Sequence, residues 1–223
     1  MKATIFSVIF SLIFVLSMQA QELYIDGGKS VTNFKFRDVL AEELQDLQST
    51  NHSYVDVGYR GKLLTKAINF VGGFGFHTYG ARGNNNFQEF LEWEATYAAI
   101  YAGIDVEVFT LGDFAFHVRG TAGPEIMLQG TQTRNNLVFD ILNEEDFDTA
   151  FIFLRGSALL EYSVSENAAL LFTYRFGRGS QINNSATGAD LQYTSNDFGI
   201  GIVYRLKSKK NKENKNTSAD AKK

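Results

Sequence analysis

The chain contains no cysteine, which excludes disulfide bonds, thiolate chemistry and metal sites with cysteine ligands. Only one residue is proline, so few positions interrupt the pairing of strands. The mean hydropathy is slightly negative, which argues against a protein that crosses a membrane with helices. Strands that alternate apolar and polar residues also average near zero, so a membrane β-barrel remains compatible with this value.

Phenylalanine and glycine are abundant, with 20 residues of each in a chain of 223. This composition fits strands that twist tightly and present aromatic rings on one face. The net charge of −4 combines two opposite parts, because residues 207–223 carry seven lysines against Glu213 and Asp220. The rest of the mature chain is acidic, and its basic residues do not cluster on one expected strand. The sequence therefore predicts no nucleic-acid partner.

Residues 197–206 show the clearest pattern, a strict alternation with a period of two residues. One face is large and apolar throughout, and it consists of Phe198, Ile200, Ile202, Tyr204 and Leu206. The opposite face is mostly small and ends in an arginine; its residues are Gly199, Gly201, Val203 and Arg205. This arrangement predicts a strand of a small membrane barrel, with the large face in lipid and the small face in a crowded interior.

Seven further segments show strand patterns, and the eight candidates are residues 23–37, 53–64, 67–79, 93–109, 114–125, 149–164, 168–178 and 197–206. Short connections (65–66, 110–113, 165–167) alternate with long ones (38–52, 80–92, 126–148, 179–193). Tight turns on one side and long loops on the other are typical of outer-membrane barrels. The predicted fold class is all-β: an eight-stranded antiparallel up-and-down transmembrane β-barrel, with both termini in the periplasm.

Two local features are predicted within these strands. Gly27 and Gly28 are expected to form a bulge, with Phe34 and Phe36 facing outward. Aromatic residues near strand ends are expected in a girdle at the membrane interfaces, and these are Trp93, Tyr97, Tyr162 and Tyr204.

The two ends of the chain are predicted to lie outside the barrel. Residues 1–20 have the three regions of a signal peptide, with Lys2 first, an apolar run next and Ala20 last. Residues 207–223 are rich in lysine and asparagine, which predicts a disordered periplasmic tail. The predicted organisation is a signal peptide (1–20), an outer-membrane barrel (21–206) and the tail (207–223).

Several short stretches resemble the small outer-membrane β-barrel proteins of flavobacterial type, which are eight-stranded barrels like OmpA and OmpX. They are the Ala-Gln junction at 20–21, Leu-Tyr-Ile-Asp-Gly-Gly at 23–28, Asn-Phe-Lys-Phe at 33–36, Gly-Tyr-Arg at 58–60 and the glycine-rich finish at 197–206. The resemblance covers residues 23–206 and includes no catalytic motif. It implies insertion into the outer membrane by the barrel-assembly machinery.

Charged residues on the small faces are the candidate site. They are Asp56, Arg60, Asp105, Glu107, Arg119, Arg155, Glu161, Arg175 and Arg205. An eight-stranded barrel has an interior just wide enough for side chains, so opposite charges are expected to pair and close the lumen. Three scattered histidines lack metal-ligand spacing, and no cofactor is expected.

The predicted function is that of a non-enzymatic, monomeric outer-membrane barrel with a structural or adhesive role through its extracellular loops. Its expected partners are membrane lipid, an extracellular ligand or, through the tail, the cell wall. A narrow channel for small solutes is the first alternative. A soluble lipocalin-like carrier is the second, with Phe70, Phe74, Phe172 and Ile200 turned inward around a ligand.

A lipid-modifying enzyme is the remaining alternative. It would use His77 or His117 with Ser157 and Glu161, and it would need these groups within hydrogen-bond reach of one another.

Overall fold

The structure is a computed structural model, which describes residues 21–37, 47–63, 67–84, 90–142, 150–182 and 190–206. The predicted signal peptide (1–20) and lysine-rich tail (207–223) lie outside the described residues. The structure therefore describes the predicted barrel region, apart from five short connecting segments.

The described residues form nine strands. These are β1 (Gln21–Arg37), β2 (Gln48–Lys62), β3 (Ile68–Asn84), β4 (Phe90–Leu111), β5 (Phe114–Arg134), β6 (Leu137–Asp140), β7 (Phe151–Ser163), β8 (Ala168–Gln181) and β9 (Asp190–Arg205). No helix within the described ranges is long and apolar enough to cross a membrane.

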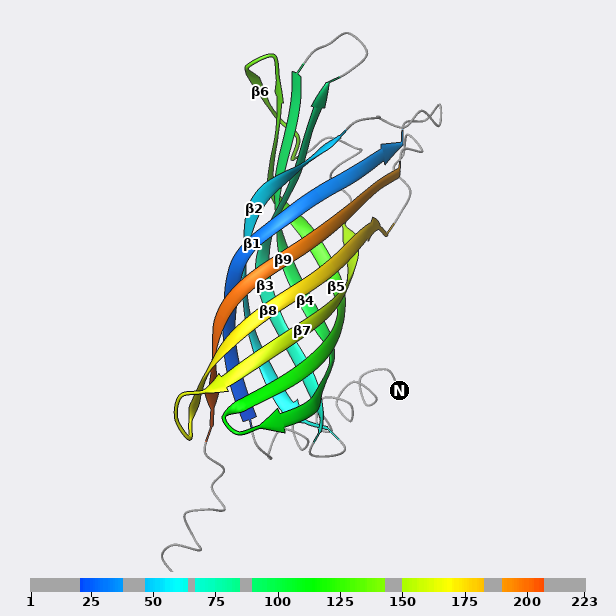
Figure 1. The fold of residues 1–223 in the computed structure, drawn as a ribbon. Helices are drawn as coiled ribbons and strands as arrows, with labels where there is room; N and C mark the ends of the chain where they lie inside the picture. The colour runs from blue at the N-terminus through cyan, green and yellow to red at the C-terminus, as the bar shows by residue number, and fades with distance from the viewer. Residues whose placement is uncertain are drawn as a thin grey trace, which may run out of the picture.

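Eight of the strands close into an antiparallel barrel, which confirms the predicted fold class. β1 pairs with β2 on one side and with β9 on the other, and β4 pairs with β5, so the ring has no open edge. β6 pairs with β5 alone and stands beyond the ring (Figure 1). We call the end of the barrel from which β5 and β6 project the hairpin end. The opposite end, where β1 starts and β9 finishes, is the terminal end.

β1 runs straight through the predicted bulge, so that prediction was wrong. Its pairing with β9 is unbroken from Glu22 to Arg37. At Gly28 the backbone of β9 comes so close that a Cβ atom would lie against the carbonyl of Phe198, which explains the glycine without a bulge. Without a bulge the alternation continues, and Phe34 points inward with 3% of its surface exposed instead of outward.

The segment predicted as a long loop at 126–148 is mostly strand. β5 continues to Arg134, and β6 returns along it after a two-residue turn. Asn135 and Asn136 form this turn with φ angles of 47° and 68°, which asparagine tolerates better than most residues. The hairpin rises well above the barrel wall (Figure 1).

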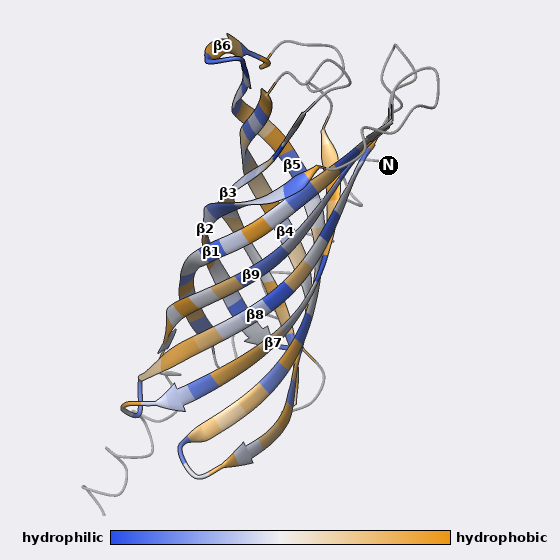
Figure 2. Cartoon of the chain, turned by 45° about the horizontal axis from the view of Figure 1, so that its top comes forward, coloured by the Kyte–Doolittle hydropathy of each residue, from blue (hydrophilic) through white to orange (hydrophobic). Residues whose placement is uncertain are grey.

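Outward side chains in the middle of the strands are apolar and exposed, as the alternation predicts. Figure 2 shows hydrophobic and hydrophilic residues following one another along these strands. From Phe198 to Leu206 an outward row rises about 26 Å along the strand, or about 20 Å vertically at a usual tilt. That height approaches the apolar band of outer-membrane barrels, which is about 25 Å tall. We call these residues the apolar belt: Leu23, Ile25, Val55, Val57, Phe70, Phe74, Phe76, Ile100, Ile104, Val106, Phe114, Val118, Ile126, Ile152, Leu154, Leu160, Leu170, Phe172, Phe176, Phe198, Ile200 and Ile202.

Towards the hairpin end the outward side chains become polar. We call these residues the polar rim: Lys29, Ser53, Glu92, Glu94, Gln129, Arg178 and Ser180. A belt bounded by such a rim is the pattern of a membrane-spanning barrel, because charged side chains belong in water or at the interface.

The apolar belt contradicts the carrier alternative, because the four residues proposed to line its ligand face outward. Phe70, Phe74, Phe172 and Ile200 have 41%, 56%, 44% and 64% of their surfaces exposed. A soluble protein would bury such rings.

The predicted aromatic girdle is only half right. Tyr162 and Tyr204 face outward near the terminal end, with 37% and 51% exposed. Trp93 and Tyr97 instead point into the barrel, with 6% and 0% exposed, because β4 extends beyond the belt and its odd-numbered residues line the interior there.

We predict that Phe172→Arg lowers the free energy of unfolding by about 2–4 kcal/mol, since it places a charge in the middle of the belt. Ser180→Arg lies on the same face of β8 but in the polar rim, and it should cost less than about 1 kcal/mol. Urea unfolding of both variants in lipid vesicles measures the difference. Equal costs would contradict the position of the belt.

Candidate functional site: the filled lumen

The inward side chains form four layers along the barrel. The inward residues of β1 pass through all of them, from Glu22 through Tyr24 and Asp26 to Phe34. The layers are therefore ionic, mixed tyrosine and aliphatic, ionic again and finally aromatic.

The ionic layer at the terminal end is built around Arg60, a residue of β2. Its Nε donates to Glu22 at 2.5 Å, and its Nη1 lies 2.5 Å from Glu161 and 3.5 Å from Asp105. Asp105 also accepts from Arg119 Nε at 2.9 Å. Arg60, Asp105 and Glu161 are almost fully buried, so each charge here depends on its partners.

Arg205 of the last strand joins the same layer. Its Nε lies 3.4 Å from Glu22 and its Nη2 lies 3.7 Å from Glu161. These contacts tie the beginning of β1 and the end of β7 to the end of β9. The same layer thus stabilises the seam at which the barrel closes.

The second ionic layer lies closer to the hairpin end and is built around Arg175 of β8. Its guanidinium reaches Asp56 at 2.7 Å, Asp26 at 3.2 Å and Asp197 at 3.9 Å. These three carboxylates come from β2, β1 and β9. One arginine therefore connects four strands across the lumen.

Arg155 of β7 is the other cation of this layer. It forms a short ion pair with Glu125, and its Nη2 donates to the hydroxyl of Tyr79 at 2.6 Å. Glu125 has no exposed surface and is the only carboxylate that pairs with Arg155 among the described residues.

Each ionic layer contains one histidine between two carboxylates. His77 lies 2.9 Å from Asp56 and 3.8 Å from Glu125. His117 lies 2.9 Å from Asp105 and 3.8 Å from Glu161. Both rings are buried, and each hydrogen-bonds to one of its two carboxylates, His77 to Asp56 and His117 to Asp105.

Tyrosine and aliphatic side chains separate the two ionic layers. The hydroxyls of Tyr24 and Tyr101 hydrogen-bond at 3.0 Å, and the guanidinium of Arg119 lies 4.6 Å from the centre of the Tyr24 ring. A cluster of buried side chains surrounds them: Val71, Leu159, Ala169, Leu171 and Val203.

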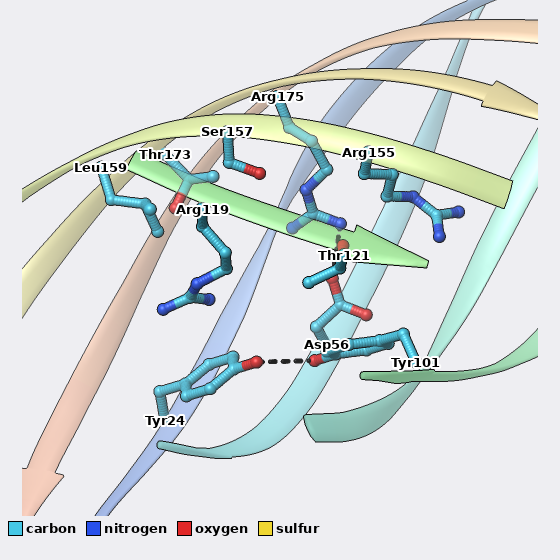
Figure 3. A pocket seen from close by; sticks show the side chains of 10 residues that line it. All are labelled: Tyr24, Asp56, Tyr101, Arg119, Thr121, Arg155, Ser157, Leu159, Thr173 and Arg175. Atoms are coloured by element: carbon cyan, nitrogen blue, oxygen red, sulfur yellow. Dashed lines mark hydrogen bonds and ion pairs between the residues drawn. The ribbon is translucent and has the colours of Figure 1, made fainter. Parts of the chain in front are cut away.

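A small cavity lies between the two ionic layers (Figure 3). Arg119, Arg155 and Arg175 line it, together with Asp56 and Tyr24. The space open to the centre of a water molecule is about 10 Å³, which is room for one water. The cavity is far too small to carry solutes.

Aromatic side chains fill the lumen above the second ionic layer. Tyr79 stacks on Phe153 with ring centres 4.8 Å apart, and Phe34 meets the edge of Trp93 at 5.3 Å. We call this cluster the aromatic plug: Phe34, Tyr79, Trp93, Tyr97, Phe151, Phe153 and Tyr193. Ionic and aromatic layers thus close the lumen in series.

The structure brings eight of the nine charged residues named from the sequence into ion pairs: Asp56, Arg60, Asp105, Arg119, Arg155, Glu161, Arg175 and Arg205. Glu107 lies apart from them. It is half-buried near the terminal end and accepts a hydrogen bond from Thr110 at 2.8 Å. Glu107 pairs with His117 at the last regular step of the β4–β5 ladder, before a bulge between Glu107 and Phe109.

Sequence reasoning missed four carboxylates of the network: Glu22, Asp26, Glu125 and Asp197. Three were visible in the alternation. Glu125 lies an even number of residues from Arg119 and therefore on the same face of its strand. The same holds for Asp197 with Arg205 and for Asp26 with Tyr24. The strand patterns place Glu125 and Asp197 at the ends of their strands, and the predicted bulge hides the facing of Asp26. The structure shows longer strands and no bulge, so all three side chains point into the lumen.

The residues of the enzyme alternative do not assemble. Ser157 lines the small cavity beside the arginines, and neither His77 nor His117 hydrogen-bonds to it within the described part of the chain. His77 belongs to one ionic layer and His117 to the other. Likewise, the described ranges contain no group of three His, Asp or Glu side chains suited to a metal ion.

The closed ring, the apolar belt and the ionic interior define an eight-stranded transmembrane β-barrel. The sequence matches no family model and no curated protein. The fold is similar to neisserial surface protein A, with 10% identity, a TM-score of 0.47 and coverage of 82% of this chain and 97% of that one.

Two further structures are similar in fold. Ail, the attachment invasion locus protein of Yersinia pestis, is 11% identical with a TM-score of 0.37, covering 83% of this chain and 98% of that one. The outer membrane protease OmpT from Escherichia coli is 10% identical with a TM-score of 0.47, covering 85% and 97%. At these scores the likenesses carry no functional argument, so function has to be argued from the molecule itself.

We predict that Glu125→Gln lowers the free energy of unfolding by about 3–5 kcal/mol, because it leaves the buried charge of Arg155 without a carboxylate. Glu107→Gln is the matched control and should change the free energy by less than about 0.5 kcal/mol. Urea unfolding in detergent measures both. A cost for Glu107→Gln as large as that for Glu125→Gln would contradict the network.

His52 provides a pH-dependent prediction outside the belt, beside the polar rim. Burial lowers the pKa of His52 below 6.5, and the carboxylate of Glu94, 3.7 Å away, opposes the shift. Folding thus disfavours the imidazolium, so the free energy of unfolding falls as the pH drops from 6.5 towards the folded pKa.

We expect Glu94→Gln to lower the pKa of His52 further, because it removes the charge that favours the imidazolium. NMR titration of imidazole-labelled protein in micelles measures the midpoint, and His52→Gln assigns the signal. A midpoint above 6.5 in the wild type would contradict the burial of the ring.

Proposed function

We propose that the protein is a non-enzymatic outer-membrane barrel with a closed lumen, which binds partners outside the cell through its hairpin end. The observation that carries this proposal is the β5–β6 hairpin. Leu137, Val138 and Phe139 are 65%, 67% and 48% exposed there, beyond the polar rim. Apolar side chains exposed together in water usually mark an interaction site.

The orientation follows from the two ends of the barrel. Glu22 pairs with Arg205, so the first strand of the barrel begins and the last strand finishes at the terminal end. In outer-membrane barrels the short turns and the termini face the periplasm, and the long connections face outward. The hairpin end is therefore extracellular in this proposal, and the terminal end is periplasmic.

The filled lumen supports a surface role over a channel. Two ionic layers and the aromatic plug lie in series along the axis. A channel would need a continuous wet path, whereas the cavity between the ionic layers holds about one water. We propose that the barrel acts as a monomeric scaffold, inserted by the barrel-assembly machinery, that presents its extracellular end.

The free edge of β6 suggests how a partner would bind. Arg134 pairs with Leu137 across the turn, and Ile141 N donates to Gly130 O, so alternate backbone groups of β6 face β5. The backbone N–H and C=O groups of Val138 and Asp140 point away from β5, and no strand among the described residues pairs with them there. An apolar edge strand can accept an extended polypeptide.

We predict that cells displaying the wild-type barrel adhere to polystyrene several-fold better than cells displaying the Leu137→Thr, Val138→Thr, Phe139→Thr triple variant. Threonine preserves strand propensity while removing most of the apolar surface. Thr131→Ser with Thr133→Ser on β5 is the control and should adhere like the wild type. Equal adhesion by the triple variant would contradict binding through the hairpin and favour a structural role in the envelope.

A further inference from the structure

The outer wall of the barrel is hollowed over β4, β5, β7 and β8. The groove opens to the surroundings and offers about 650 Å³, within the usual range for ligand sites. Two rows of outward residues cross the groove, and in each row the residues are paired directly from one strand to the next. The first row is Ile104, Gly120, Gly156 and Phe176, and the second is Ala102, Ala122, Leu154 and Arg178.

The floor of the groove is backbone, because its central residues have no side chains. A Cβ atom added at Gly120 or Gly156 would meet no other atom within 4 Å. Large side chains stand on both sides of this floor, with Leu154, Phe176 and Ile104 exposed by 62%, 50% and 49%. The groove can therefore take an apolar chain without any rearrangement of the wall.

Arg178 lies at the upper end of the groove, in the polar rim. Its Nη2 donates to Gln192 Oε1 at 2.6 Å, and no carboxylate within the described ranges pairs with it. Arg178 is exposed at the height of the membrane interface, where a phosphate can accept two parallel hydrogen bonds from a guanidinium.

The tilt of the strands places the second row obliquely in the membrane. On β8 the belt ends at Phe176, so Arg178 lies just above it. On β4 the belt residues Ile100 and Ile104 lie on either side of Ala102, which therefore sits within the hydrocarbon layer. The row thus descends from a cation at the interface to small residues inside the membrane.

We propose that this groove binds one phosphate-bearing lipid of the leaflet at the hairpin end. Its phosphate pairs with Arg178, and one acyl chain lies over Gly156 and Gly120 towards Ala102. Acyl chains supply apolar contact with the floor and walls, and the cation selects an anionic headgroup. This lipid site is independent of what the hairpin binds.

Native mass spectrometry of the purified barrel in detergent tests the proposal, with phosphatidylglycerol or phosphatidylcholine of identical acyl chains as probes. The wild type should retain one phosphatidylglycerol preferentially. Gly156→Leu fills the groove and should weaken retention of either lipid about tenfold, the scale of a few lost methylene contacts. Arg178→Gln should weaken the phosphatidylglycerol complex about two- to fivefold, as for an exposed ion pair, and the phosphatidylcholine complex less, because choline already offsets the charge of that phosphate.

Two controls match these variants. Ala98→Leu places the same leucine side chain on the outward face of β4 outside the groove, and Lys29→Gln removes a rim cation on β1. Both should retain lipid like the wild type. Heat-modifiable gel mobility verifies that each variant is folded, and Gly120→Leu replaces Gly156→Leu if the latter does not fold.

Retention unaffected by the folded groove variant would overturn the proposal. So would equal losses in the variants and their controls, which would indicate a non-specific lipid shell. A change in oligomeric state on filling the groove, with no change in bound lipid, would assign the groove to a second copy and equally overturn the proposal.

Discussion

The pairing of β1 with β9 closes the sheet, and the other features of the molecule depend on that closure. Within hydrocarbon each backbone N–H and C=O has to be paired inside the protein, so an open edge would be very costly. The closure is reinforced from inside, where Arg175 reaches carboxylates on β1, β2 and β9 and Arg205 reaches Glu22. Long-range pairs thus hold together the first and last strands of the chain.

Closure also determines how the lumen is filled. Eight strands leave an interior of side-chain width, and alternation supplies polar residues to it from every strand. Arginines and carboxylates pair in two layers because a lone buried charge is destabilising. Above them the barrel wall continues past the belt, and there aromatic rings fill the interior. Outside this wall, the same strands provide an apolar surface, an apolar groove that ends at Arg178, and an exposed hairpin.

The fold could be predicted from the sequence because a period of two residues is a local signal. Phe198 to Leu206 shows which face meets lipid without any knowledge of the partner strands. The ends of the strands were harder, because their length depends on tertiary pairing. Polar residues such as Gln132 and Arg134 look like loop residues until β6 pairs with them.

The candidate site was predictable only in part for the same reason. Asp56, Arg60 and Arg175 lie within segments of regular alternation, which predicts that their side chains point into the lumen. Glu125 and Asp197 lie where the strands were thought to end, and which arginine they meet depends on register across the lumen. Phe34 and Trp93 were predicted to face outward because large aromatic rings are common on the lipid side of a barrel. Both point inward instead, at a height where the wall lies above the apolar belt. Residue type alone does not identify the side of a barrel wall.

Conductance across a planar bilayer tests the closed lumen most directly, with insertion verified by the heat-modifiable band of the same reconstituted protein. The account predicts that the inserted wild-type barrel gives flat current traces at both polarities. Reproducible single-channel steps that scale with the amount of inserted protein would contradict it, because they would require a wet path through both ionic layers and the aromatic plug.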